Sequence, residues 1–218
     1  MIKSLILDLD DTIFPTRSIG MDCIAPLFHR IPFKKYGYQK SDIANIMEEL
    51  WKRPMADVAE MYDFPDQLIS EYHQIASTHE YAFEITPYED YIYLKSLPQS
   101  MHLVTTGTTP VQQQKIDALA IRGDFRHILI NDPFVISGGK QACFIEIMEK
   151  ESLQPEQVLV IGDNKDSEIA AAKKLAIPWV LIDRSLKEHD LANRRITGFD
   201  GLLPLLDMFG PDTLDLKD

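Results

Sequence analysis

The sequence predicts an α/β fold, in which a doubly wound parallel sheet carries an inserted α-helical domain. Short apolar runs alternate with helical patterns through most of the chain, and this alternation is typical of a parallel sheet covered by helices. After the first apolar run, however, a long stretch contains only helical patterns. The chain has 218 residues, of which 45% are hydrophobic, so it can form one substantial core and a small helical domain beside it.

The strands are predicted from their apolar runs. The first run, Ser4 to Leu9, ends in carboxylates, as expected of a strand that is buried on both faces and reaches the surface at its end. Four later runs have the same character and complete the predicted sheet: 102–106, 127–130, 157–161 and 179–182.

The segments between the later strands have the spacing of helices. Pro110 to Leu119 begins with proline at the first helical position, and Thr109 is the predicted N-cap. Lys140 to Glu151 places its apolar residues on one stripe, and Ser167 to Leu175 is rich in alanine. These helices would connect parallel strands.

The long helical stretch covers residues 16–86. It contains a helix capped by Ser41 and a second one from Pro65 to Ser77, each with apolar residues at helical spacing. Prolines punctuate the stretch. We therefore predict a helical domain at 16–86, inserted into a core formed by 1–15 and 87–218.

The composition restricts the possible partners. Lys and Arg number 22 against 34 Asp and Glu, and the formal net charge of −12 disfavours binding to nucleic acid or to an anionic membrane. No apolar run approaches the ~20 residues that span a bilayer, and the N-terminus lacks the pattern of a signal peptide. Cys23 and Cys143 are isolated thiols, which suit a reducing compartment. We expect a cytoplasmic protein, either a monomer or a homodimer.

Four polar motifs follow predicted strands. Because open α/β sheets bind ligands at the carboxyl ends of their strands, we expect these motifs to form one site. They are Asp8-Leu9-Asp10-Asp11-Thr12, Thr105-Thr106-Gly107, Lys140 after Gly138-Gly139, and Gly162-Asp163-Asn164-Lys165-Asp166-Ser167-Glu168.

The residue types in these motifs suit phosphoryl transfer. Of two carboxylates at one strand end, one can attack as a nucleophile while the other donates and accepts protons. A threonine hydroxyl can bond a phosphoryl oxygen, a lysine can offset its charge, and Asp163 with Glu168 can offer oxygen ligands to a hard cation. Taken alone, each motif also has an ordinary structural explanation, as a helix cap, a turn or a solvated surface residue.

In this order, the motifs resemble the haloacid dehalogenase-like hydrolase superfamily, from about Ile2 to Asp183. The position of the insert resembles the helical-cap phosphatases of that superfamily. The resemblance implies a Rossmann-like core with a mobile cap, and hydrolysis of a small-molecule phosphate ester. Asp8 would form an aspartyl-phosphate and Asp10 would act as acid and base, while Thr105 and Lys140 would orient the phosphoryl group. Mg²⁺ would be the cofactor, and the implied ligands are Asp8, the main-chain carbonyl of Asp10, Asp163 and Glu168.

Three points stay open at this stage. The family often has aspartate at the position of Glu168, so Asp166 competes for the role of supporting the metal. Asp10 favours phosphorus chemistry, because the dehalogenase branch of the superfamily lacks this second carboxylate. A phosphomutase would use the same residues as a phosphatase, and a non-catalytic phosphate-binding or regulatory module is a further alternative.

Overall fold

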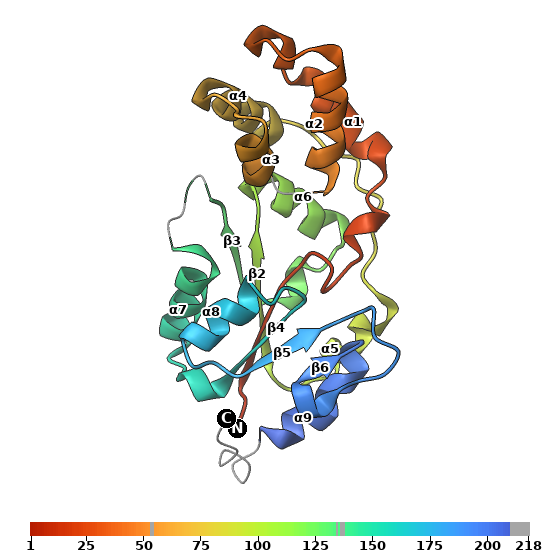
Figure 1. The fold of residues 1–218 in the computed structure, drawn as a ribbon. Coiled ribbons are helices and arrows are strands. Elements are labelled where there is room, and N and C mark those ends of the chain that lie inside the picture. The colour runs from red at the N-terminus through yellow and green to blue at the C-terminus, as the bar shows by residue number, and fades with distance from the viewer. Residues whose placement is uncertain (53–54, 134, 136–137, 210–218) are drawn as a thin grey trace. The chain divides into compact units, whose positions relative to one another are not determined.

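The computed structural model describes residues 1–52, 55–133, 135 and 138–209. The chain divides into two compact units, Met1–Ser18 with Ile85–Asp218 and Ile19–Glu84 (Figure 1). The second unit is therefore inserted into the chain of the first, after its first strand. The predicted insert, residues 16–86, encloses this unit, and its role as a cap stays a prediction.

The first unit contains a six-stranded parallel sheet in the order β3-β2-β1-β4-β5-β6. At its centre, Ser4 of β1 lies opposite Ser100 of β2 and Val158 of β4. All four residues of β1 are buried, as expected for the middle strand of a sheet that helices cover on both faces. The doubly wound parallel sheet is thereby confirmed. The strands are β1 Ser4–Leu7, β2 Ser100–Thr106, β3 His127–Asn131, β4 Val158–Gly162, β5 Trp179–Ile182 and β6 Arg195–Ile196.

The helices of this unit lie between successive strands, except α9, which follows the last strand. The α-helices are α5 Ile92–Lys95, α6 Thr109–Ala118, α7 Gly139–Glu151, α8 Glu168–Lys174 and α9 Leu202–Met208. Short 3-10 helices occur at Thr16–Ser18, Glu89–Tyr91, Arg122–Asp124, Pro155–Gln157, Leu191–Asn193 and Phe199–Gly201.

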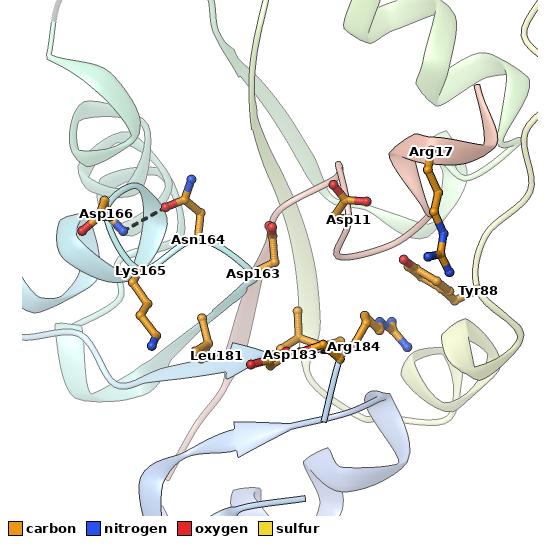
Figure 2. A pocket seen from close by; sticks show the side chains of 12 residues that line it. Asp11, Arg17, Tyr88, Asp163, Asn164, Lys165, Asp166, Leu181, Asp183 and Arg184 are labelled. Carbon is orange, nitrogen blue, oxygen red and sulfur yellow. Dashed lines mark hydrogen bonds between the residues drawn. The ribbon is translucent and has the colours of Figure 1, made fainter. Parts of the chain in front are cut away.

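The strand order changes direction between β1 and β4. The chain moves from β1 to β2 on one side and returns to β4 on the other, which opens a crevice at the carboxyl ends of these two strands. Asp8 follows β1 and Asp163 follows β4 at this edge. Beside them lies a pocket of about 620 Å³, lined by residues that follow β1, β4 and β5 (Figure 2).

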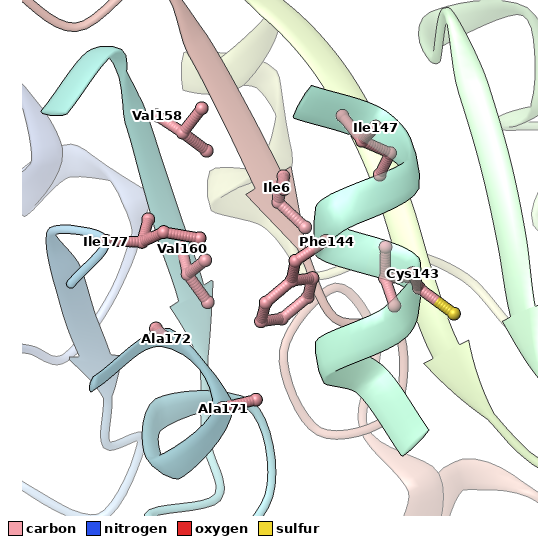
Figure 3. Close-up of a cluster of buried hydrophobic side chains, with 10 residues drawn as sticks. Ile6, Cys143, Phe144, Ile147, Val158, Val160, Ala171, Ala172 and Ile177 are labelled. Carbon is pink, nitrogen blue, oxygen red and sulfur yellow. The ribbon is translucent and has the colours of Figure 1, made fainter. Parts of the chain in front are cut away.

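One hydrophobic cluster fixes α7 and α8 on the sheet. Figure 3 shows Phe144 and Ile147 of α7 against Ile6 of β1 and Val160 of β4. Ala171 and Ala172 of α8 complete the cluster, and their small side chains allow a close approach of helix to sheet. This packing determines where the N-termini of both helices lie, and these termini carry Lys140 and Glu168.

The second unit is helical throughout its described residues. It has its own core, in which Phe33, Ile46, Val58 and Leu68 are buried. Its helices are α1 Met21–Arg30, a 3-10 helix at Phe33–Tyr36, α2 Lys40–Lys52, α3 Met55–Met61 and α4 Asp66–Ser77. None of the helices formed by the described residues of the chain has both the length and the apolar character needed to cross a bilayer.

Some local predictions were wrong. Thr109 is the first residue of α6 and Thr108 is the N-cap, and the N–H and hydroxyl of Thr109 both donate to Asp132. Ser41 lies inside α2, which begins at Lys40. The first strand ends at Leu7 and not at Leu9, and β6 was not predicted, since two residues carry no periodicity.

Candidate active site

Asp8 is buried at the end of β1. Its main-chain N–H donates to the carbonyl of Ile161 in β4, which continues the ladder between the two strands. One carboxylate oxygen, Oδ1, accepts from Nζ of Lys140 at 2.7 Å, and the other accepts no hydrogen bond from the residues that the structure describes. Burial raises the pKa of Asp8 to about 7, although the charge of Lys140 opposes the shift. The carboxyl group of Asp8 is thus shielded from water, and only one of its two oxygens accepts a hydrogen bond from the described residues.

Lys140 joins two carboxylates at the start of α7. Its Nζ lies 2.7 Å from Oδ1 of Asp8 and 2.7 Å from Oε2 of Glu168. Burial alone would lower the pKa of Lys140, but the charges of Asp8 and Glu168 outweigh it and raise the pKa above its ordinary value. Lys140 therefore stays an ammonium ion inside the site.

Glu168 is fully enclosed, and both of its oxygens have partners. Oε2 accepts from Lys140, and Oε1 accepts from the main-chain N–H of Asn164 at 2.6 Å. Gly162 is essential to this arrangement, because a Cβ at that position would overlap Cγ and Oε1 of Glu168. The glycine of the fourth motif thus provides the space for the carboxylate that follows it.

Asp163 places a second carboxylate close to that of Asp8. Its Oδ1 accepts from the hydroxyl of Thr12 at 3.3 Å. Burial raises the pKa of Asp163 to about 6, and the charge of Glu168 adds to the shift.

Asp8, Asp163 and Glu168 each offer one oxygen within 4.8 Å of the others. An all-oxygen donor set of this kind fits a hard divalent cation such as Mg²⁺. Asp166, the competing candidate, is exposed and lies outside this cluster, with its N–H bonded to the side chain of Asn164 (Figure 2). The structure therefore brings together three of the residues proposed as metal ligands and leaves Asp166 apart.

Asp10 is held by a different set of residues. Nζ of Lys115 donates to its Oδ1 at 2.7 Å, and Nε2 of Gln112 donates to its Oδ2 at 2.9 Å. Nε2 of Gln112 also donates to Oγ1 of Thr105, which is fully buried. Because this bond occupies an acceptor position on Thr105, the hydroxyl hydrogen of Thr105 remains available to a substrate oxygen.

The contacts of Gln112 and Lys115 were not foreseen from the sequence. Neither residue belongs to the four motifs from which the site was predicted. The available signal was their spacing on one face of the helix that follows Thr105, since residues so spaced point to the same side.

Comparisons with known proteins agree with this geometry. A family model described as haloacid dehalogenase-like hydrolase matches residues 5–182, which include each of the four motifs. The chain is 22% identical, over 216 residues and 89% of each protein, to a glyceraldehyde 3-phosphate phosphatase of Methanopyrus kandleri.

Solved structures show the same fold. A crystal structure of a haloacid dehalogenase-like phosphatase from Thermococcus onnurineus superimposes with a TM-score of 0.65 at 17% identity, covering 94% of this chain and 98% of that one. A 2-haloacid dehalogenase from Pseudomonas syringae gives a TM-score of 0.62 at 16% identity, covering 96% and 100%. At such identities the likeness concerns the fold, whereas the family match concerns the sequence itself. The chain belongs to the haloacid dehalogenase-like hydrolases.

Proposed function

We propose that the chain is a Mg²⁺-dependent phosphatase that hydrolyses a small-molecule phosphomonoester through an aspartyl-phosphate on Asp8. One observation carries this proposal: two neighbouring carboxylates are each held by a different lysine. Asp8 is paired with Lys140, while Asp10 is paired with Lys115. Two carboxylates with different partners suit the two tasks of a phosphatase, which are nucleophilic attack and proton transfer. A single carboxylate would not provide both.

In the first step, the unbonded oxygen of Asp8 forms a bond to phosphorus as the bond from phosphorus to the ester oxygen breaks. Asp10, in its protonated form, transfers its proton to that oxygen, so the alcohol leaves as a neutral molecule. Lys140 and the hydroxyl of Thr105 bind the phosphoryl oxygens and offset their charge.

In the second step, Asp10 takes a proton from a water molecule while the oxygen of that water attacks phosphorus. The bond between phosphorus and Asp8 breaks, inorganic phosphate leaves, and both aspartates regain their starting forms. Gln112 and Lys115 orient Asp10 for both proton transfers.

The residues that would hold Mg²⁺ are Asp8, Asp163 and the main-chain carbonyl of Asp10. When bound, the cation supplies positive charge that lets a dianionic ester approach the carboxylate of Asp8. We propose that Glu168 supports this site by fixing Lys140, since both of its oxygens are already bonded within the chain.

The helical unit Ile19–Glu84 is proposed to act as the cap, because it is inserted after the strand that carries Asp8. We propose further that the enzyme acts in the cytoplasm on small sugar or triose phosphates. The similarity to a glyceraldehyde 3-phosphate phosphatase supports testing triose phosphates first.

Phosphate release from a panel of triose phosphates, hexose phosphates, nucleoside monophosphates and an aryl phosphate tests the proposal. Wild type, Asp8→Asn and Asp166→Asn are assayed with Mg²⁺ and with chelator. We expect turnover by wild type and Asp166→Asn, and none by Asp8→Asn or after chelation. Conversion of a sugar phosphate to its isomer without phosphate release would identify a phosphomutase. Phosphate binding without any turnover would indicate a regulatory module.

A further inference from the structure

Arg184 connects the loop of Asp10 to two other segments of the first unit. It follows β5 by two residues and lies at the pocket shown in Figure 2. Its Nη2 donates to the carbonyl of Thr12 at 2.9 Å, and its Nη1 donates to Oδ2 of Asp90 at 2.5 Å. The guanidinium group also lies 3.8 Å from the ring centroid of Tyr88. Only 20% of the side chain is exposed.

Thr12 links Arg184 to the active site. It follows Asp10 by two residues and is fully buried, and its hydroxyl donates to Asp163. The residue between them, Asp11, has a φ of 52°, in the left-handed region that aspartate adopts more readily than most residues with a side chain. Arg184 thus holds the backbone of a tight turn whose two ends carry Asp10 and a contact to Asp163.

The other side of Arg184 is itself firmly held. Oδ2 of Asp90 accepts from the main-chain N–H of Phe199 at 2.8 Å as well as from Arg184. The main-chain N–H of Tyr88 donates to the carbonyl of Ile13 at 2.8 Å. Arg184 is therefore braced by a partly buried carboxylate and an aromatic ring, and the segment that carries them bonds to the same loop.

We propose that Arg184 is a positioning residue for phosphoryl transfer: it fixes the carbonyl of Thr12, and thereby the orientation in which Asp10 reaches the leaving oxygen. This inference rests on the proposed function. Arg184 touches neither Asp8 nor Asp10, so it acts through the backbone of the loop. A planar guanidinium can donate to two acceptors while stacking on a ring, whereas a lysine ammonium cannot reproduce all three contacts.

The test compares Arg184→Gln and Arg184→Lys with Arg195→Gln. Arg195 is a matched control, because it also pairs with an aspartate, Asp183, beside β5 but has no contact with the Asp8–Phe14 loop. The first readout, amide hydrogen exchange of peptides covering residues 8–14, needs no enzymatic activity. We expect faster exchange there in both Arg184 variants and no change in Arg195→Gln.

The second readout is the dependence of kcat on the leaving group. Para-nitrophenolate leaves without protonation, whereas the alkoxide of glycerol phosphate needs the proton of Asp10. We expect kcat with glycerol phosphate to fall by about tenfold to a hundredfold in the Arg184 variants, as for a small misplacement of a catalytic group, with KM little changed. The loss with para-nitrophenyl phosphate should be clearly smaller.

The outcomes separate the two proposals. Equal losses with both esters, or unchanged exchange at residues 8–14, would overturn the positioning role of Arg184. If wild type hydrolyses no ester, the proposed function fails. Faster exchange in Arg184→Gln alongside an unaltered Arg195→Gln would then still support the hold of Arg184 on the loop.

Discussion

Lys115 and Asp10 form an ion pair in the candidate active site, with Nζ of the lysine 2.7 Å from Oδ1 of the aspartate. The lysine comes from α6 and the aspartate from the loop after β1. Asp8, two residues before Asp10, is paired instead with Lys140 from α7. The two carboxylates therefore do not compete for one cation, and each can be oriented independently.

Replacing Lys115 by methionine should slow catalysis. Asp10 would lose the donor to Oδ1 and keep only Gln112, so its carboxyl group would be less well directed at the leaving oxygen. We expect kcat with an alkyl phosphate to fall by about a hundredfold, within the range of general acid–base catalysis. Steady-state kinetics of Lys115→Met measures the effect. Lys150→Met is the control, since Lys150 forms an exposed ion pair with Glu146, and unchanged activity in both variants would refute the role of Lys115.

Replacing Gly162 by alanine should disturb Lys140 indirectly, through Glu168. The added methyl group would overlap Glu168, which must then move away from Lys140. We expect a large loss of kcat and a loss of about 1–3 kcal/mol in the free energy of unfolding, as in other overpacked interiors. Urea denaturation and kinetics measure both quantities.

Gly123→Ala is the matched control for Gly162→Ala, because a Cβ at Gly123 meets no atom within 4 Å. If Gly162→Ala behaves like Gly123→Ala, the close approach of Glu168 to the backbone of Gly162 has no importance for the site.

Mg²⁺ should stabilise the folded protein through Asp163 and not through Asp166. A ligand that binds only the folded state at a hundred times its Kd adds about 2.7 kcal/mol to the free energy of unfolding. We expect Mg²⁺ to raise the Tm of wild type and of Asp166→Asn, and to have little effect on Asp163→Asn. Thermal denaturation with Mg²⁺ and with chelator measures this difference. A Tm shift lost in Asp166→Asn and kept in Asp163→Asn would reverse the assignment.

His102 should lower the free energy of unfolding at mildly acidic pH, against the opposite contribution of Asp8 and Asp163. Its imidazole is fully buried in β2, with Nε2 bonded to the hydroxyl of Ser4 at 2.8 Å. Burial lowers the pKa of His102 to about 4 from 6.5, and the stacked ring of His127, 5.2 Å away, adds to the shift. Between these pH values the unfolded chain binds a proton that the folded chain does not bind. His102 therefore contributes a decrease in the free energy of unfolding of at most about 3 kcal/mol as the pH falls from 6.5 to 4. Asp8 and Asp163 contribute an increase, because the folded chain protonates them at a higher pH than the unfolded chain does.

Urea denaturation of wild type and His102→Gln as a function of pH isolates the contribution of His102 to the free energy of unfolding. In His102→Gln this contribution is absent, so between pH 6.5 and pH 4 the free energy of unfolding should fall less, or rise more, than in wild type. His29→Gln, which replaces an exposed histidine, should retain the slope of wild type. The same pH dependence in His102→Gln as in wild type would show that His102 makes no such contribution.

The sequence was informative wherever a local pattern determines the structure. The apolar run of β1, the helix that begins at Gly139 and the glycine before Asp163 are all local signals, and the structure places them at one edge of the sheet. The alternation of elements predicts the parallel sheet, and the restricted hand and length of the connections limit the possible strand orders without choosing one.

Contacts between distant side chains could not be predicted in this way. Arg184 reaches the carbonyl of Thr12 across the sheet, and Gln112 meets Asp10 only because α6 follows β2, the strand that pairs with β1. The two-residue strand β6 exists through pairing with β5 and has no pattern of its own. The role of Glu168 as a metal ligand stays a prediction, and its hydrogen bonds to Lys140 and Asn164 could not be foreseen because they depend on the packing of α7 against α8.

The most direct test of the account is to trap the phosphorylated side chain. The enzyme is mixed with a substrate from the panel that it hydrolyses, quenched in acid during turnover, reduced with borohydride and digested for peptide mass spectrometry. Because borohydride reduces an aspartyl-phosphate to homoserine, we predict homoserine in place of Asp8 in wild type, and no such product in Asp8→Asn. Turnover with an unmodified Asp8, or with the modification at Asp10 or Asp163, would contradict the assignment of Asp8 as the nucleophile.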